Sequence, residues 1–216
     1  MANRKALIVA GGWDGHEPKK CAHLFQGVLK KEGFDVEISD TLEVYEDAEK
    51  LAGLSLIVPI WTMGQITGEQ SKGLIDAVAS GVGLGGFHGG MCDSFRNNLG
   101  YQWMTGGQFL SHPDGIKDYT VNITSDDPIV AGLSDFQMHS EQYYMYVDPG
   151  VTVLAHTTFV GLNSYQWVEG TVMPVVWKRQ WDQGRVFFSS LGHVATDFDV
   201  PEALEIQRRG FLWAAR

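Results

Sequence analysis

The sequence is short of several residue types, and each shortage excludes a class of protein. Its 216 residues include two cysteines, Cys21 and Cys92, which are too few for a disulfide framework. Lysine and arginine together number 16 against 26 acidic residues, and no basic cluster could follow a phosphate backbone, so we expect no nucleic-acid partner. The longest apolar stretches, such as LSLIVPIW, are far shorter than the ~20 residues that cross a bilayer, so we expect no membrane partner.

The N-terminal sequence MANRKALIVAGG lacks the apolar region of a secretory leader, because it passes directly into a strand pattern. Together with the low cysteine content, this points to the cytoplasm. A chain that is 44% hydrophobic and 19% charged can bury one substantial core, and we expect a single domain over residues 1–216. The net charge of −10 favours a small neutral or polar ligand.

Strand and helix patterns alternate through the first half of the chain. Short apolar runs at residues 6–10, 34–38, 54–60 and 82–87 are typical of strands, and the unbroken run ALIVA is typical of a parallel strand covered on both faces. Helices are expected from Pro18 to a stop at Gly33, and from the capping-box residue Thr67 to about Ser80. This alternation predicts an α/β fold with a mostly parallel central sheet flanked by helices.

The pattern changes in the second half of the chain. We expect a short helix at residues 91–98 and a long loop at residues 98–114, which would act as a lid over the sheet edge. Between residues 119 and 188, β-rich runs separated by Gly, Pro, Asp and Asn predict extra strands. A final helix over residues 201–215 is expected to pack on the sheet.

Three histidines directly follow predicted strands. His16 follows the first strand, His88 the fourth, and His193 the last apolar run, RVFFSSL. Sheets of this kind bind ligands beyond the carboxyl ends of their parallel strands, so these side chains are candidates for an active site. The pattern does not assign His139. The others are expected to be structural or at the surface: His23, His112 and His156.

The turn GFHGG carries His88 at its apex. Its G-x-Nu-x-G pattern places glycines around an apex residue that is held in a strained conformation. Serine or cysteine normally occupies this apex, whereas histidine is better suited to proton transfer, hydrogen bonding or metal ligation. Either His88 performs such chemistry or it merely caps the next helix. Cys92, one helical turn later, is expected to be a buried structural thiol.

A carboxylate completes the candidate set. In FQMHSEQYYMY, alternation places Gln137, His139, Glu141 and Tyr143 on one face of an extended segment. Glu141 is therefore a candidate base or ligand, and the alternative is an ordinary surface ion pair.

Aromatic side chains near the same edge are candidates for substrate binding. Trp13 and Trp61 each follow a strand, and Trp103 lies in the expected 98–114 loop. Aromatic faces line sugar sites through contacts with apolar C–H groups, and Asp14 could accept hydrogen bonds from sugar hydroxyls. The alternatives are ordinary packing for the tryptophans and a solvated turn for Asp14.

Several of these features occur together in one known family. The strand ALIVAGG with its following histidine, the GFHGG turn, the Glu141 and Tyr143 pair, and GRVFFSSLGH with FLWAA resemble the trehalose-utilisation (ThuA-like) family over nearly the whole chain. The resemblance implies the class I glutamine amidotransferase-like fold, a flavodoxin-like three-layer sandwich. Amidotransferases have a cysteine at the apex and a glutamate two residues after the triad histidine. Here His88 and Ala195 stand at those positions, so we do not expect a glutaminase.

The resemblance also implies carbohydrate metabolism, in which related systems oxidise glucosides to keto sugars and then isomerise or cleave them. Such chemistry needs a base near a carbon next to a carbonyl, and an electrophile that stabilises the enediolate. We expect one catalytic pocket formed by His16, His88, Glu141, Tyr143 and His193. A divalent ion, zinc first, would bind to His88, Glu141 and His193. No nucleotide cofactor is expected, and the expected partners are a small sugar and further copies of the chain.

Two hypotheses account for these features. The first is an isomerase, lyase or hydrolase that acts on keto sugars or keto glycosides, which explains why the candidates share one sheet edge. The second is a non-catalytic carbohydrate-binding or assembly protein, which explains the missing cysteine. Convergence of the five side chains in one cleft favours catalysis, whereas scattered positions favour binding.

Overall fold

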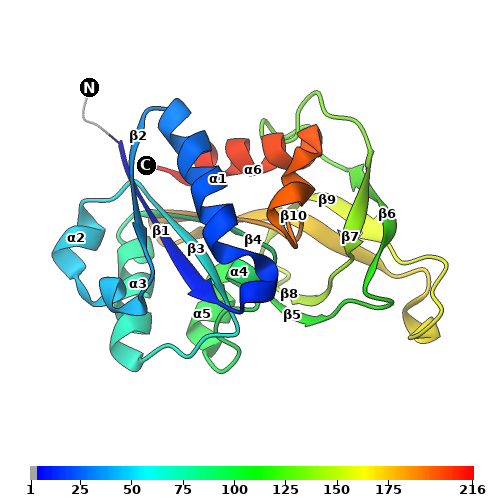
Figure 1. Cartoon of the computed structure of the whole chain (residues 1–216), viewed down its shortest axis with the longest axis horizontal. Coiled ribbons are helices and arrows are strands. Elements are labelled where there is room, and N and C mark those ends of the chain that lie inside the picture. Colours follow the sequence, from blue (N-terminus) through cyan, green and yellow to red (C-terminus); the bar gives the residue numbers. More distant parts are fainter. Residues whose placement is uncertain (1–3) are drawn as a thin grey trace.

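The chain folds around a large mixed sheet (Figure 1). The computed structural model describes residues 4–216, in which β1 (Arg4–Gly12), β2 (Phe34–Ser39), β3 (Leu56–Thr62), β4 (Gly83–Phe87) and β11 (Gly184–Ser189) run parallel. Beyond β11 the sheet continues antiparallel with β10 (Val172–Trp181), β9 (Thr152–Thr158), β6 (Ile116–Ile123) and β7 (Phe136–Glu141). The order is β2-β1-β3-β4-β11-β10-β9-β6-β7, and β5 (Gly107–Ser111) pairs separately with β8 (Tyr144–Val147).

Helices cover both faces of the parallel part and make three layers. On one face lie α1 (Pro18–Lys31) and α6 (Pro201–Ala214), and on the other lie α2 (Ala48–Ala52), α3 (Gly68–Ala79) and α5 (Leu99–Thr105). The predicted α/β class, the flavodoxin-like sandwich and the extra strands of the second half are therefore confirmed. Within residues 4–216, no helix combines the length and the apolar character that crossing a membrane requires.

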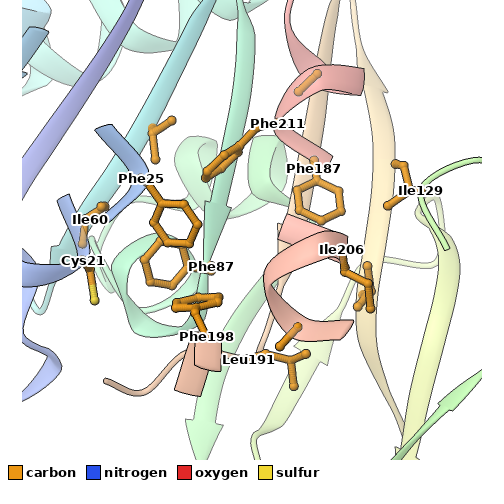
Figure 2. Packing of buried hydrophobic residues seen from close by; sticks show 14 of the residues in the cluster. Cys21, Phe25, Ile60, Phe87, Ile129, Phe187, Leu191, Phe198, Ile206 and Phe211 are labelled. Carbon is orange, nitrogen blue, oxygen red and sulfur yellow. The ribbon is translucent and has the colours of Figure 1, made fainter. Parts of the chain in front are cut away.

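Alternating side chains along the strands build a separate core on each face. In β1, Ile8 packs toward α1 and α6, whereas its neighbour Leu7 packs toward α3 and α5. Figure 2 shows the first core, in which the ring of Phe25 lies 5.1 Å from that of Phe87 and 5.2 Å from that of Phe211. Each buried phenylalanine stabilises the fold by roughly 1.5–3 kcal/mol. The strand ends are thus fixed from both faces.

Local signals set most helix ends. The predicted capping box at α3 is confirmed, because Thr67 accepts a hydrogen bond from the Gln70 backbone N–H and the Gln70 side chain accepts one from Thr67. The predicted helix at residues 91–98 is wrong in its bounds: α4 (His88–Cys92) begins at the apex of the turn.

The expected loop at residues 98–114 is also wrong, because it contains α5 and β5. Asn98 caps α5 by accepting a hydrogen bond from the Tyr101 backbone N–H, and Gly106 ends the helix with a φ of +82°. Tyr101 and Met104 are buried, which ties this segment to the sheet.

Candidate active site

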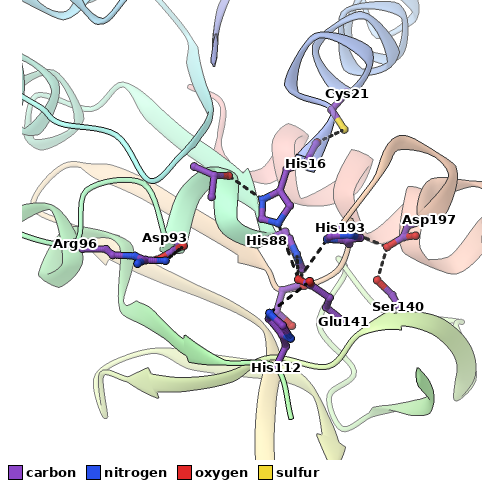
Figure 3. Close-up of polar contacts among 12 residues, drawn as sticks. His16, Cys21, His88, Asp93, Arg96, His112, Ser140, Glu141, His193 and Asp197 are labelled. Atoms are coloured by element: carbon purple, nitrogen blue, oxygen red, sulfur yellow. Dashed lines mark hydrogen bonds and ion pairs between the residues drawn. The ribbon is translucent and has the colours of Figure 1, made fainter. Parts of the chain in front are cut away.

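Four side chains from distant parts of the chain meet at the carboxyl ends of the parallel strands (Figure 3). His16 follows β1, His88 follows β4, His193 follows β11, and Glu141 is the last residue of β7. One possible ligand atom from each lies within 4.8 Å of all the others. We refer to these four residues as the histidine–glutamate cluster. The structure therefore brings together four of the five residues that the sequence suggested for catalysis.

The GFHGG turn positions His88 in the cluster. His88 has a φ of +47°, a left-handed conformation that is strained for a residue with a Cβ atom. Its neighbours must be small: a Cβ on Gly89 would lie 2.6 Å from the His16 ring, and a Cβ on Gly90 would lie 3.0 Å from the Ile60 Cα. The strained apex that the glycine pattern predicted is therefore present.

Glu141 lies at the centre of the cluster. Its Oε2 is 3.1 Å from His88 Nε2, 3.3 Å from His193 Nδ1 and 3.9 Å from His16 Nε2. A tetrahedral zinc ion with bonds of about 2.0–2.1 Å places its ligand atoms roughly 3.3 Å apart. The observed separations are close to this value, so the group could hold a metal ion after small side-chain movements.

The protonation of His88 supports a cation in the cluster. His88 Nδ1 lies 2.8 Å from the carbonyl oxygen of Ser190, which only accepts hydrogen bonds, so Nδ1 carries a proton. Burial lowers the pKa of His88 despite its contact with Glu141, so the ring is neutral and Nε2 presents a lone pair. Metal-binding histidines typically donate their other N–H to such a carbonyl. A lone pair that faces a carboxylate oxygen is repelled unless a cation lies between them.

The other two histidines also direct a nitrogen toward Glu141. Thr62 Oγ1 lies 2.9 Å from His16 Nδ1 and leaves His16 Nε2 on the side of the carboxylate. His193 Nδ1 is buried and makes no hydrogen bond of acceptable geometry. A buried polar atom without a partner costs roughly 1–3 kcal/mol. The donor set, three nitrogens and one carboxylate oxygen, is one that zinc commonly takes.

The pKa values of the cluster are coupled through Glu141. Burial, reinforced by His88 and His193, lowers the pKa of His16 to about 3, so His16 is neutral at pH 7. Burial alone would raise the pKa of Glu141, but its contacts with His193 and His88 outweigh burial and hold the pKa well below the usual value. The Glu141 carboxylate in turn raises the pKa of His193. Glu141 is therefore ionised at neutral pH.

The segment that carries Glu141 departs from the predicted alternation. Gln137 and His139 are exposed on β7, whereas Glu141 and Tyr143 are 8% and 4% exposed. The prediction that these four side chains share one face is wrong, because β7 ends at Glu141 and the chain changes direction before β8. This change of direction carries Glu141 into the cluster while His139 pairs with Asp118 outside it.

Tyr143 supports the cluster by packing against the His88 ring. The two rings stack with centroids 3.9 Å apart. Burial raises the pKa of Tyr143 well above its ordinary value, so the hydroxyl stays protonated. Tyr143 can therefore donate a hydrogen bond, but it is not a base at neutral pH.

A cavity of about 150 Å³ opens beside the cluster. Three of the residues proposed for catalysis line it, namely His16, Glu141 and Tyr143, and so does Trp13, which is 47% exposed. The ring of Trp13 lies 4.7 Å from that of His16. Trp13 thus occupies the position expected of an aromatic wall.

The other three residues proposed for substrate binding do not line this cavity. Asp14 is exposed in the short 3-10 helix Asp14–His16, and Trp61 is partly buried. Trp103 lies on α5 against Trp181, with ring centroids 5.1 Å apart. The expected loop that was to bring Trp103 over the site is instead the helix α5.

Sequence reasoning missed His112, which it placed among the structural or surface residues. His112 lines the cavity, is 43% exposed, and has its Nε2 3.6 Å from Glu141 Oε1, on the oxygen that the other histidines leave free. It directly follows β5, so the rule that site residues follow strand ends would have found it had residues 107–111 been identified as a strand.

Asp197 ties together two segments that carry cluster residues. Its Oδ2 accepts hydrogen bonds from Ser140 Oγ at 2.5 Å and from the His193 backbone N–H at 2.9 Å. Replacing Asp197 with alanine leaves both donors without a partner, and we expect a loss of roughly 1–3 kcal/mol in the free energy of unfolding. Urea denaturation measures this loss. The exposed Asp199 provides the control, and equal stability of the two alanine variants would contradict the prediction.

Both cysteines are buried thiols rather than nucleophiles. Cys21 and Cys92 are 0% and 1% exposed, and neither forms a disulfide. Burial raises the pKa of Cys21 to about 12 and raises that of Cys92 well above its ordinary value, so neither is a thiolate at pH 8. We expect an aromatic disulfide reagent to react with neither thiol of the native protein and with both after denaturation. A rapidly reacting thiol in the native protein would contradict this assignment.

Comparisons with known proteins agree with the fold and the motifs. The model of the ThuA family, described as trehalose utilisation, matches residues 5–214. A ThuA-like protein from Bacteroides uniformis ATCC 8492 is similar in structure, with a TM-score of 0.78, 19% identity, and 98% of this chain and 91% of that chain covered. A ThuA-like protein from Parabacteroides merdae ATCC 43184 has a TM-score of 0.74, 17% identity, and coverage of 98% and 89%. A cytoplasmic protein from Salmonella typhimurium LT2 has a TM-score of 0.67, 16% identity, and coverage of 98% and 97%. No curated protein matches the sequence.

Proposed function

The chain belongs to the trehalose-utilisation (ThuA) family, and we propose that it is a metal-dependent cytoplasmic enzyme that isomerises or cleaves a keto sugar or keto glycoside. Family membership supports a role related to trehalose utilisation. The observation that carries the metal-dependent chemistry is the neutral His88, whose Nε2 lone pair faces the Glu141 carboxylate at 3.1 Å. This arrangement is stabilised when a cation lies between the two groups.

We assign His88, Glu141 and His193 as the residues that hold the ion, and zinc as the ion. His16 Nε2 is the farthest of the three histidine nitrogens from Glu141 Oε2, and unlike His88 and His193 it lines the cavity. His16 therefore stands on the side from which a substrate enters. A zinc ion with an open coordination position polarises a substrate carbonyl and stabilises the enediolate.

The chain's own side chains would handle the proton. Glu141 is ionised, and its Oε1 points away from the three histidines toward His112. His112 is partly exposed and lines the cavity, so its Nε2 is placed to take a proton from a carbon next to the carbonyl and to return it to the neighbouring carbon. Trp13 covers the apolar face of the sugar, and the protonated hydroxyl of Tyr143 donates to a substrate oxygen.

The metal content of the purified, untagged protein tests this proposal. We expect about one zinc per chain, as for a single catalytic site, and loss of the metal in the variants His88→Ala, Glu141→Gln and His193→Ala, because each removes one ligand. Elemental analysis after dialysis measures the metal.

His139→Ala is the matched control, since His139 lies on the same strand as Glu141 but pairs with Asp118 at the surface. The control should retain its metal. A metal-free protein that keeps activity on keto sugars would leave acid–base catalysis without a metal. A protein that binds sugars but never converts them would favour the alternative, a carbohydrate-binding protein on an amidotransferase-like fold.

A further inference from the structure

We propose that Asp93 and Arg96 form a subsite for the hydroxyl groups of one uncharged sugar ring, so that the cavity excludes sugar phosphates and disaccharides. This inference rests on the proposed function, because it assigns the substrate of the same site. Both side chains line the cavity together with Glu141. Neither residue was identified from the sequence, because Asp93 and Arg96 follow α4 rather than a strand.

The carboxylate of Asp93 is held firmly in the cavity wall. Asp93 is 3% exposed, and its Oδ1 accepts hydrogen bonds from Arg96 Nε at 2.7 Å and from Gln108 Nε2 at 3.2 Å. Its Oδ2 accepts a hydrogen bond from Arg96 Nη2 at 2.8 Å. The backbone also fixes the segment, because the Asp93 carbonyl accepts a hydrogen bond from the Met63 N–H at 2.8 Å. A rigid carboxylate–guanidinium pair of this kind is well suited to orienting a ligand.

Arg96 has donors left for a ligand. A guanidinium carries five N–H groups, and within residues 4–216 Arg96 donates side-chain hydrogen bonds to Asp93 alone. The side chain is 52% exposed, so the unused N–H groups are accessible. One acceptor position on Asp93 Oδ2 is also free of a second donor. The pair thus offers both donors and an acceptor, which is what a pattern of neighbouring hydroxyls requires.

The charge of this subsite selects against phosphate. The charge of Arg96 is balanced by Asp93, with which it makes two hydrogen bonds, and Glu141 adds a further negative charge to the cavity. The whole chain carries a net charge of −10. A phosphate group beside these carboxylates would meet repulsion without an unpaired cation among the side chains that line the cavity. A neutral ring meets no such repulsion.

The size of the cavity selects for one ring. Its volume of about 150 Å³ lies well below the ~300–1,000 Å³ of pockets that enclose drug-sized ligands. Trp13 and Phe109 supply aromatic surface at its walls, and the hydroxyl-binding pair supplies polar contacts. A disaccharide would leave its second ring outside the cavity, where the structure provides no comparable set of contacts.

The test uses the zinc-loaded full chain and three probes: glucose, glucose 6-phosphate and trehalose. Ligand-observed NMR titration measures the affinity of each. We expect glucose to bind more tightly than the other two, and Arg96→Ala to weaken glucose binding by roughly 10–100-fold, as expected for loss of hydrogen bonds to a charged group. Arg96→Lys should restore little, because a lysine ammonium cannot reproduce the planar fork. Zinc content should stay unchanged in both variants.

Lys72→Ala is the control, since this exposed lysine of α3 pairs with Asp76 and does not line the cavity. Tighter binding of glucose 6-phosphate or of trehalose than of glucose overturns the inference. Unchanged glucose affinity in Arg96→Ala, with zinc retained, overturns the subsite but leaves the proposed function intact. Absence of both zinc and sugar binding from the wild-type protein overturns the two together.

Discussion

Replacing Gly89 with alanine is expected to weaken zinc binding by roughly 10–100-fold, the effect seen when groups that orient metal ligands are removed. The added Cβ would lie 2.6 Å from His16 Cε1 and 2.8 Å from His16 Nδ1, closer than real Cβ contacts allow. The His16 ring would have to move, which breaks its hydrogen bond to Thr62 and opens the cluster. Because a side chain rather than the backbone gives way, the fold should survive with a loss of about 1–3 kcal/mol.

Gly27→Ala is the matched control for this substitution. Gly27 lies in α1 with nothing within 4 Å of an added Cβ. Alanine there should stabilise the helix by roughly 0.5–1 kcal/mol and leave zinc binding unchanged. Isothermal titration with zinc and urea denaturation measure the two quantities. Wild-type zinc affinity in Gly89→Ala would show that His16 does not depend on the space at this turn.

Patterns close together in the sequence predict most of the parallel sheet. The run ALIVA is buried on both faces in β1, and the glycine pattern from Gly86 to Gly90 correctly predicts the strained apex at His88. Such signals succeed because strand burial and positive φ impose requirements on neighbouring residues. His16, His88 and His193 could therefore be placed at one edge from the strand ends alone.

Features that depend on tertiary packing were not predictable in the same way. Nothing in the alternation of β7 shows that the chain changes direction after Glu141 and so separates Glu141 from His139. The segment at 98–114 has the sequence pattern of a loop because its cap residues, Asn98 and Gly106, enclose only two turns of helix. The Asp93–Arg96 pair is positioned by the backbone hydrogen bond to Met63, which sequence spacing does not reveal.

Acidification of the metal-free protein from pH 7 to pH 4 is expected to destabilise it by at least about 3 kcal/mol. The pKa of His16 is lowered from 6.5 to about 3 by burial and by the neighbouring histidines. Between these two values the unfolded chain binds a proton that the folded chain does not. Each pH unit within this window therefore costs about 1.4 kcal/mol of stability.

The other members of the cluster modify this dependence with known signs. Burial lowers the pKa of His88, and the histidine contacts lower that of Glu141, so both lose stability as pH falls, Glu141 mainly below its ordinary value of 4.5. The raised pKa of His193 acts in the opposite direction, because its contribution is fully present below pH 6.5 and is lost as pH rises. Two groups thus add to the effect of His16 and one opposes it.

The variant His16→Gln isolates the largest of these contributions. Glutamine cannot take up the proton, so the difference in free energy of unfolding between pH 7 and pH 4 should shrink by about 3 kcal/mol. His139→Gln removes an exposed histidine from β7 and should leave the difference near its wild-type value. Urea denaturation of the chelator-treated proteins at both pH values makes the comparison. An equal pH dependence in wild type and His16→Gln would show that His16 is not held neutral by the fold, and the arrangement of the cluster around an unprotonated His16 would then be wrong.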